Sequence, residues 1–514
     1  MNQVEKSSKK CPICGRSPHK ESIYCIFHAK AEEKTEKDFK DALKEYVNRI
    51  KEKNGDCNFV KFIFIGDIID FKKDLNIKIF KNAIFSGATF EGHVFFLETI
   101  FKGKADFFRT TFKGDIYFSN VSFEGKADFL RAKIEGKADF TGATFKENTD
   151  FRNTIFAGNA YFSFAVFEGK ADFTEATLDK SSEFKGTTFK ANACFESTNF
   201  KGDTIYFTNA IFEGDANFFV VSFKGNSNFV EATFKRGANF EQAIFESDVD
   251  FRVNYFNKKL NLSKIKTFSG NKLFVKLNNK EGEISFERAS LENIYLDMEL
   301  VRGVLIDFTD ALLRNTKVKK DQIESHILQE KEKKFSEARE IYLILKNNFH
   351  SIGHYNDESW AFKKEKDMER KNYCHFRTLH QWLWYCFLNA IFGYGEKPWN
   401  AILSAGILIF TFALLFSFIG IGNPEIIELK GTAIHHQDVE NIVDLESKGL
   451  LKNDITRNFP DSLYFSLITF TTLGYGDFRP LEGIGRILAG SEAFIGAFIM
   501  ALFVYTFARR TGGR

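Results

Sequence analysis

The stretch 471–477 reads T-T-L-G-Y-G-D, and its residue types suggest a chemistry more plainly than any other part of the chain. Two glycines flank a tyrosine, so the backbone there can reach conformations that are closed to other residues. Successive carbonyl oxygens can then turn inward, and a ring of such oxygens can replace the hydration shell of a cation. The stretch therefore predicts a cation-binding loop built from backbone carbonyls.

The sequence around this loop is typical of a membrane domain. Residues 400–421 carry no charge and are long enough to cross roughly 30 Å of hydrocarbon. A second apolar stretch, 484–508, follows the loop. Between them, 460–472 predicts a helix too short to span, with Pro460 and Asp461 suited to its first turn. Such a re-entrant segment is allowed only where it faces protein or water.

The order of span, short helix, T-T-L-G-Y-G-D and span resembles the pore domain of two-span potassium channels. The resemblance implies K⁺ as the permeant ion, a lipid bilayer around the protein, and a homotetramer, because four loops close one pore. It implies that the hydroxyl of Thr472 closes the inner site and that Asp477 hydrogen-bonds behind the filter at its outer mouth. The short helix lacks the Trp pair that some relatives have there, which leaves the bracing of Tyr475 open. The implied selectivity filter is Thr471, Thr472, Leu473, Gly474, Tyr475, Gly476 and Asp477.

Two residues of the second span are further candidates. Gly496 matches the glycine at which the inner helix of this family can bend, although a glycine in a span also permits close helix packing. Both interpretations stand. Glu492 is an ionisable side chain inside the span, so we expect it to face protein or water and to serve function. The chain shows no ladder of arginines, and no voltage sensor is expected.

A second G-Y-G occurs at 393–395. It lacks the preceding threonines, Pro398 follows closely, and it stands before the first span instead of between the two. We therefore expect a turn at the membrane surface there.

Cys11, Cys14, Cys25 and His28 have the spacing C-x2-C-x10-C-x2-H. Three thiolates and one imidazole make a closed tetrahedral set, which is typical of structural zinc (Zn²⁺). A reduced cysteine cluster without metal is the alternative, and His19 could compete with His28 as a ligand. Seven Cys and a start without an apolar core do not indicate a secreted disulfide framework.

The 63 Phe of the chain are its strongest compositional anomaly. From Phe80 to Phe256 they recur at alternating gaps of five and six residues, with one extra residue before Phe207. This spacing does not follow the 3.6-residue turn of a helix. A solenoid fits it, because Phe can stack on Phe from coil to coil.

The repeated unit, as in F-E-G-K-A-D-F-L-R-A-K from Phe123, resembles the pentapeptide-repeat family. That resemblance implies a right-handed quadrilateral β-helix, clear over 80–256 and looser over 284–313. The stretches 57–79 and 257–283 break the rhythm and are expected to be a cap and an irregular insertion. Some members of this family imitate DNA, which needs a strongly acidic surface. Here both signs of charge are mixed within each repeat, so no nucleic-acid role is expected.

The parts combine into a multidomain chain with a net charge of +3. Residues 333–349 place apolar side chains on one helical stripe, and 376–390 are aromatic and amphipathic, which suits a bilayer surface. The expected order is a zinc module with a charged helix (1–56), the β-helix (57–316), an α-helical hairpin (317–372), an interfacial helix (373–398) and the all-α two-span pore domain (399–514).

Two functions from different classes remain. One is a potassium-selective channel without a voltage sensor, gated or scaffolded by the cytoplasmic β-helix. The other is a membrane-anchored scaffold that recruits a cytoplasmic protein partner, with conduction secondary. Lys397, Arg509, Arg510 and Arg514 predict that both termini lie on the cytoplasmic side of a cell inner or plasma membrane, with 422–458 outside. An enzyme is not expected, because the sequence shows no nucleophile–base pair or open metal site.

Overall fold

The computed structural model describes residues 10–20, 22–257, 259–277, 280–373, 378–422, 455–481 and 483–511. They fall into two compact units, Met1–Glu358 and Ser359–Arg514, and each is described by itself. Most of the predicted outer segment 422–458 lies outside the described residues, as does Arg514.

The first unit opens with η1 (Ala31–Glu33) and helix α1 (Glu36–Glu52). The Thr35 hydroxyl caps α1 by accepting a hydrogen bond from the backbone N–H of Asp38. Phe39, Leu43 and Val47 recur every four residues and are buried, so α1 packs one apolar stripe and exposes its charged face. The predicted charged helix is confirmed.

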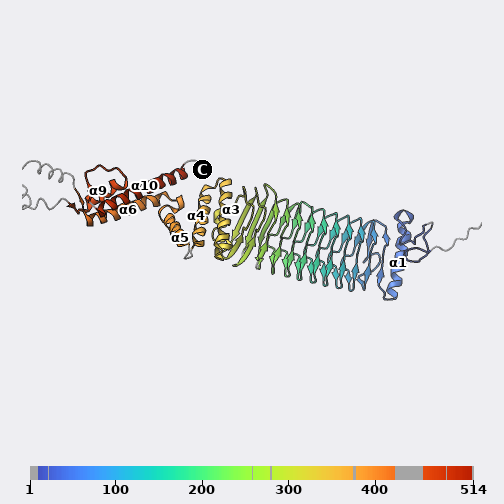
Figure 1. The fold of residues 1–514 in the computed structure, drawn as a ribbon. Coiled ribbons are helices and arrows are strands. Elements are labelled where there is room, and N and C mark those ends of the chain that lie inside the picture. The colour runs from blue at the N-terminus through green and yellow to red at the C-terminus, as the bar shows by residue number, and fades with distance from the viewer. Residues whose placement is uncertain are drawn as a thin grey trace, which may run out of the picture. The chain divides into compact units, whose positions relative to one another are not determined.

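A four-sided solenoid follows, from β1 (Cys57–Asn58) to β42 (Val304–Asp307). In the described part of the chain its strands form four parallel sheets of 12, 10, 11 and 9 strands, stacked coil upon coil as Figure 1 shows. These sheets are the sides of the predicted quadrilateral β-helix, whose fold is confirmed. One coil takes a strand from each sheet, for example β9 (Ala105–Asp106), β10 (Thr111–Phe112), β11 (Ile116–Tyr117) and β12 (Ser122–Phe123).

The strand register reproduces the sequence repeat. Ala105 pairs with Ala127 in the next coil, so one coil takes two eleven-residue units. The extra residue before Phe207 lengthens a single coil, in which Ser182 pairs with Ile205. The original offset returns in the next coil.

Columns of phenylalanine form the core of the solenoid. The rings of Phe118, Phe140 and Phe162 stack with centroids 5.0 and 4.9 Å apart and planes within 8°. Neighbouring columns meet edge to face, as between Phe118 and Phe129 at 85°. Aromatic rings prefer these two arrangements over a face-to-face sandwich without offset. All four rings have no solvent exposure, so the predicted stacking from coil to coil is confirmed.

Residues in the left-handed backbone region recur at corners of the coils. They include glycine and asparagine, which tolerate a positive φ, and also Arg109, Glu175 and Val220, with φ of 55°, 57° and 58°. A β-branched residue such as Val220 is strained there, and it persists because the flanking strands fix the corner.

The expectation of a cap over 57–79 and an irregular insertion over 257–283 is wrong. β1 and its successors β2 (Ile63–Phe64) and β3 (Ile68–Asp70) pair in parallel with strands of the next coil. β39 (Lys272–Leu277) pairs with β35 (Val249–Val253) and with β41 (Tyr295–Leu300). The rhythm breaks there because these coils take more residues: Cys57 pairs with Ala83 and Val249 with Leu273, offsets of 26 and 24 in place of 22. Leu and Val replace Phe in the core of the C-terminal coils, whereas the first coil keeps buried phenylalanines.

Helices close the C-terminal end of the solenoid within the first unit (Figure 1). After η2 (Lys320–Gln322) and α2 (Leu328–Lys331), helix α3 (Phe335–Ser351) buries Ile341, Tyr342 and Leu345. Asn348 hydrogen-bonds the backbone of Thr316 with both ends of its amide, at 2.9 Å each. A helix therefore pairs the backbone N–H and C=O of Thr316 at the end of the solenoid.

The second unit is mainly helical. It holds most of α4 (Tyr355–Asn372), then α5 (Leu379–Phe392), α6 (Pro398–Ile419), α9 (Phe459–Phe470) and α10 (Ile484–Thr511). Short strands β43 (Ile421–Gly422), β44 (Ile455–Thr456) and β45 (Arg479–Pro480) form a small antiparallel sheet between them. Leu379, Leu383, Trp384 and Phe387 are exposed along α5, as an interfacial helix requires.

The second G-Y-G forms the single turn η4 (Gly393–Gly395) directly before α6. Gly393, Tyr394 and Gly395 have φ of 53°, 60° and 87°. The predicted turn is confirmed.

Candidate functional sites

The short helix α9 begins with Pro460 in its first turn, as predicted, and ends at Phe470. It packs between the two long helices: Phe465 meets Phe416 of α6 edge to face at 4.9 Å. Phe470 shares an apolar cluster with Ala401 of α6 and Ile499 of α10. The loop that follows therefore starts from a point held by both spans.

The loop 471–477 leaves the helix through a left-handed bend. Thr472, Gly474 and Gly476 have φ of 57°, 51° and 83°, so the two glycines occupy positions where other residues are strained. Leu473 and Tyr475 are 59% and 70% exposed in the single chain. A loop that exposes large apolar side chains at membrane depth needs further protein around it.

Asp477 lies near the short helix. Its Oδ1 accepts a hydrogen bond from the backbone N–H of Phe478 at 3.2 Å. The ring of Tyr464 also meets that of Phe478, with centroids 6.1 Å apart. These contacts fasten the C-terminal end of the loop to α9.

Gly496 lies against the end of α9. A β-carbon built on Gly496 would stand 2.3 Å from the carbonyl oxygen of Phe470, closer than real contacts allow. Of the two interpretations of this glycine, close packing is the one that the geometry shows, since only glycine lets α10 approach the backbone there.

Glu492 is fully buried one turn before Gly496. Its Oε1 is hydrogen-bonded to the Ser466 hydroxyl of α9, and that same hydroxyl lies 2.9 Å from the carbonyl oxygen of Ile409 in α6. Three helices thus meet at one serine. The carboxyl faces protein, as expected.

In the part of the chain that the structure describes, two helices are long and apolar enough to cross a membrane: Pro398–Ile419 and Ile484–Ala508, with mean hydropathies of 2.5 and 2.1. Only 17% of each apolar window is buried within the chain. Their exposed side chains, such as Phe418 and Phe494 at 79% and 77%, must be covered by lipid or by other protein chains.

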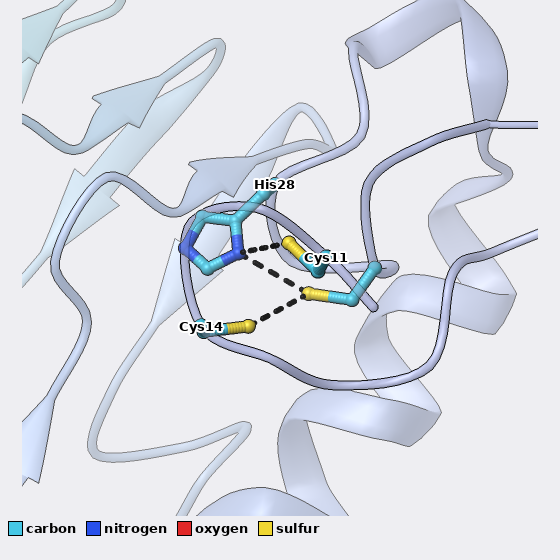
Figure 2. Close-up of side chains that lie close together, drawn as sticks. Cys11, Cys14 and His28 are labelled. Atoms are coloured by element: carbon cyan, nitrogen blue, oxygen red, sulfur yellow. Dashed lines mark hydrogen bonds between the residues drawn. The ribbon is translucent and has the colours of Figure 1, made fainter. Parts of the chain in front are cut away.

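The second candidate site is the cysteine–histidine cluster. The ligand atoms of Cys11, Cys14, Cys25 and His28 all lie within 4.8 Å of one another, and Figure 2 shows Cys11, Cys14 and His28 converging. His19 is not part of this set. The Cys14 and Cys25 sulfurs are 3.5 Å apart, and Cys11 Sγ is 3.6 Å from His28 Nδ1. A tetrahedral zinc site with Zn–S of about 2.3 Å has ligand separations of about 3.5–3.8 Å, which these two distances match. Cys25 Sγ lies 3.2 Å from His28 Nδ1, so these two atoms must move apart by a few tenths of an ångström to hold the ion.

The electrostatics of the cluster also fit a cation. Burial raises the pKa of the Cys11 thiol, but backbone N–H donors outweigh burial and lower that pKa to about 6. Burial and the neighbouring Cys25 raise the pKa of Cys14 to about 11. Adjacent thiols cannot all ionise without a positive charge between them, and a divalent metal supplies that charge.

The cluster is fastened to the first coil of the solenoid. With Nδ1 of His28 turned to the sulfurs, its Nε2 donates to the carbonyl of Val60 at 3.0 Å, which fixes the ring. The ring of Phe27 stacks on Phe62 at 4.5 Å. Lys34 Nζ donates to the carbonyls of Ile26 and Ile63 and so bridges the cluster and the coil.

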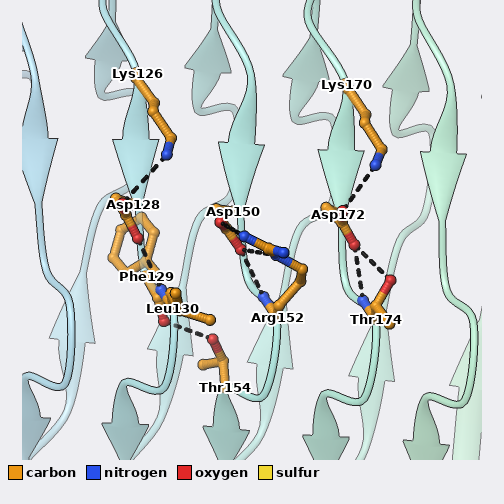
Figure 3. A network of polar contacts seen from close by, with 10 residues as sticks. All are labelled: Lys126, Asp128, Phe129, Leu130, Asp150, Arg152, Thr154, Lys170, Asp172 and Thr174. Atoms are coloured by element: carbon orange, nitrogen blue, oxygen red, sulfur yellow. Dashed lines mark hydrogen bonds and ion pairs between the residues drawn. The ribbon is translucent and has the colours of Figure 1, made fainter.

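The outer faces of the solenoid carry paired charges. In Figure 3, Lys126 and Lys170 pair with Asp128 and Asp172 at 3.3 and 2.8 Å, and Arg152 holds Asp150 with two hydrogen bonds. Each carboxylate also accepts the backbone N–H two residues on. These aspartates repeat the same hydrogen bond from coil to coil. Their role is therefore structural, since they close turns.

Some residues of the pore unit were not among the sequence candidates. Ser466 and Phe470 became visible as contacts of Glu492 and Gly496 only in the structure. The available signal in the sequence was the pair Ser462 and Ser466, one turn apart on a mainly apolar short helix.

Two family models match parts of the chain. Residues 427–512 match a family described as "Ion channel", and 118–166 and 129–177 match pentapeptide repeats. The chain thus carries pentapeptide repeats and an ion-channel pore domain. With two candidate spans, this indicates a membrane protein.

Curated relatives share short stretches with the chain. They include a voltage-gated potassium channel protein of Caenorhabditis elegans (44% identical over 45 residues, 9% of this chain and 8% of that protein). Two pore potassium channel a of Oryza sativa subsp. japonica is 43% identical over 49 residues, 10% of this chain and 14% of its own length. A putative potassium channel protein of Rhodopseudomonas palustris is 40% identical over 43 residues, 8% and 10%.

The chain thus spans at most about a seventh of the length of these relatives. All three relatives are named as potassium channel proteins. No solved structure matches the chain significantly.

Proposed function

We propose that this protein is a potassium-selective channel in which four chains close one pore. The observation that carries the proposal is the loop 471–477, which follows a half-length helix wedged between two candidate spans. The carbonyls of Thr472, Leu473, Gly474 and Tyr475 would bind K⁺, and the Thr472 hydroxyl would close the inner site.

The apolar side chains that the single chain leaves exposed support assembly of several chains into one pore. Leu473 and Tyr475 project from the loop, and a neighbouring chain would bury them while completing the ring of carbonyls. With one G-Y-G on each loop, four copies give the cation a full set of oxygens in place of water.

The solenoid would lie in the cytoplasm, with both termini, in a cell inner or plasma membrane. We propose that it gates or scaffolds the pore, because α3 closes the solenoid end and α4 leads on to the pore unit. A cytoplasmic protein partner would bind its charged faces.

We further propose that Cys11, Cys14, Cys25 and His28 hold a structural zinc ion. All four positions of a tetrahedral site are filled by protein ligands, which leaves none open for catalysis. The ion would fasten the N-terminal segment to the first coil through His28 and Val60.

The test of conduction is the reversal potential of the purified protein in planar bilayers under opposed K⁺ and Na⁺ gradients. The proposal predicts a reversal potential near that of K⁺, and its loss in Gly474→Ala or Gly476→Ala. A reversal potential that ignores K⁺ overturns it. If those variants keep the biological role while conduction is lost, the chain is a membrane-anchored scaffold.

A further inference from the structure

The contact between Ser466 and Glu492 defines where a proton must lie. A serine hydroxyl has one proton to donate, and the carbonyl oxygen of Ile409, 2.9 Å away, can only accept one. If the hydroxyl donated to Glu492 instead, the Ser466 Oγ and the carbonyl oxygen of Ile409 would stand 2.9 Å apart with no proton between them. The hydroxyl therefore donates to Ile409, and the contact with Glu492 needs a proton from the carboxyl.

The other carboxyl oxygen points to the same state. Glu492 Oε2 is buried and has no hydrogen-bond partner among the described residues. An ionised carboxylate needs donors or a cation around both oxygens, whereas a carboxylic acid tolerates a bare carbonyl oxygen far better.

No cation in the described pore unit is recorded in contact with this carboxyl. Helix α6 has no ionisable side chain between Pro398 and Ile419. The ionisable side chains of α9 and of the described segment after it are Asp461, Tyr464, Tyr475, Asp477 and Arg479, and α10 itself carries Arg486, Tyr505, Arg509 and Arg510 besides Glu492. Ser466 is the hydrogen-bond partner that the structure gives.

We propose that Glu492 is a neutral carboxylic acid that donates its proton to Ser466 and so positions the short helix α9, and with it the loop 471–477, against α10. This inference rests on the proposed channel function. When Glu492 ionises, a buried negative charge faces the lone pairs of Ser466, and α10 separates from α9.

A separation of α10 from α9 at Glu492 affects the loop because Glu492 lies close to the helix contact that precedes the loop. Glu492 and Gly496 stand one turn apart on α10, and Gly496 touches the carbonyl of Phe470, the last residue before the loop. Separation at Glu492 therefore loosens the support of Thr471 and Thr472. Potassium flux should fall as pH rises through the ionisation of Glu492.

Two measurements on the full-length protein in liposomes test the proposal. The first is the infrared difference spectrum between wild type and Glu492→Gln at neutral pH, which should contain the C=O stretching band of a protonated carboxylic acid. Carboxylate bands in its place overturn the proposal. This readout is independent of ion conduction, so it decides the state of Glu492 even if the protein proves not to conduct K⁺.

The second measurement is K⁺ flux against pH. Wild type should lose flux at alkaline pH. Glu492→Gln should keep its acid-side flux throughout, because the amide N–H₂ still donates to Ser466 and cannot ionise. Ser462→Ala, at a buried serine one turn earlier on α9, should retain the wild-type profile. Identical pH profiles for wild type and Glu492→Gln overturn the proposal.

Discussion

The carbonyl oxygen of Phe470 occupies the position where Gly496 would otherwise carry a side chain. Phe470 is the last residue of α9, so this contact joins α10 to the start of the loop 471–477. A β-carbon on Gly496 would approach the oxygen to 2.3 Å. The glycine in the second span thus acts first as a packing residue, and its role as a bending point stays a prediction.

Replacing Gly496 by alanine should separate α10 from α9. Overpacking of this kind costs typically about 1–3 kcal/mol, so Gly496→Ala should lower the thermal stability of the assembled protein in detergent and reduce K⁺ flux. Gly490→Ala is the matched control, because it lies on the same helix and its added β-carbon would meet nothing within 4 Å. Equal behaviour of the two variants would mean that the contact with Phe470 does not limit packing.

A second glycine pair tests the solenoid. A β-carbon on Gly136 would stand 2.5 Å from the backbone of Gly114 in the preceding coil, whereas one on Gly237 would meet nothing within 4 Å. Backbone cannot move aside without breaking the strand pairs on either side. Gly136→Ala should therefore destabilise its coils by about 1–3 kcal/mol and Gly237→Ala by less than about 0.5 kcal/mol.

Hydrogen exchange on the full-length protein separates these effects, because each coil contacts only its neighbours. Amides in the coils next to Gly136 should lose protection in Gly136→Ala, and remote coils should not. Uniform loss along the whole solenoid would contradict a local clash.

The sequence predicts the solenoid well because one residue type, Phe, repeats at the spacing of the coils. It does not predict the left-handed corners, because Arg109, Glu175 and Val220 share no side-chain property. The strands of the coils at either end are also hidden, because extra residues interrupt the spacing of the repeat, and at the C-terminal end Leu and Val take the place of Phe.

In the pore unit, the loop can be predicted from the sequence because its glycines are few and flanked by apolar stretches. The contacts that hold the loop cannot be predicted from the sequence, because they depend on how α10 is rotated against α9. Glu492 stands out as an ionisable residue in a span, whereas its partner Ser466 is an ordinary serine until the helices are packed.

The aspartate columns of the solenoid predict acid sensitivity. Partial burial raises the pKa of Asp172, but hydrogen bonds from Lys170 and Thr174 outweigh burial and leave that pKa below its ordinary value. A carboxyl whose pKa is lower in the folded state adds stability above its unfolded pKa, about 3.9, and loses it as pH falls through the folded value. Exchange protection around Asp172 should thus decline below about pH 4.

Asp172→Asn is the informative variant, because the amide oxygen can still accept the N–H of Thr174. The chain itself uses Asn217 in the same column, where it accepts from Phe219 at 3.2 Å. The variant should lose some protection at neutral pH and show a shallower decline in acid. If exchange protection declined in acid as steeply as in wild type, carboxylates other than Asp172 would cause the acid sensitivity.

Removing the metal ligands should loosen the N-terminal end of the solenoid alone. Cys25→Ser leaves three ligands, and the hydrogen bond from His28 to Val60 then loses the ring orientation that the ion provides. The purified wild type should contain one zinc per chain by elemental mass spectrometry, and Cys25→Ser much less. Amides around Val60 and Ile63 should exchange faster in the variant and after chelation.

Cys194→Ser, in the middle of the solenoid, is the control and should retain the metal and the protection. Full zinc content in Cys25→Ser, or unchanged exchange after its loss, would contradict a structural role for the ion.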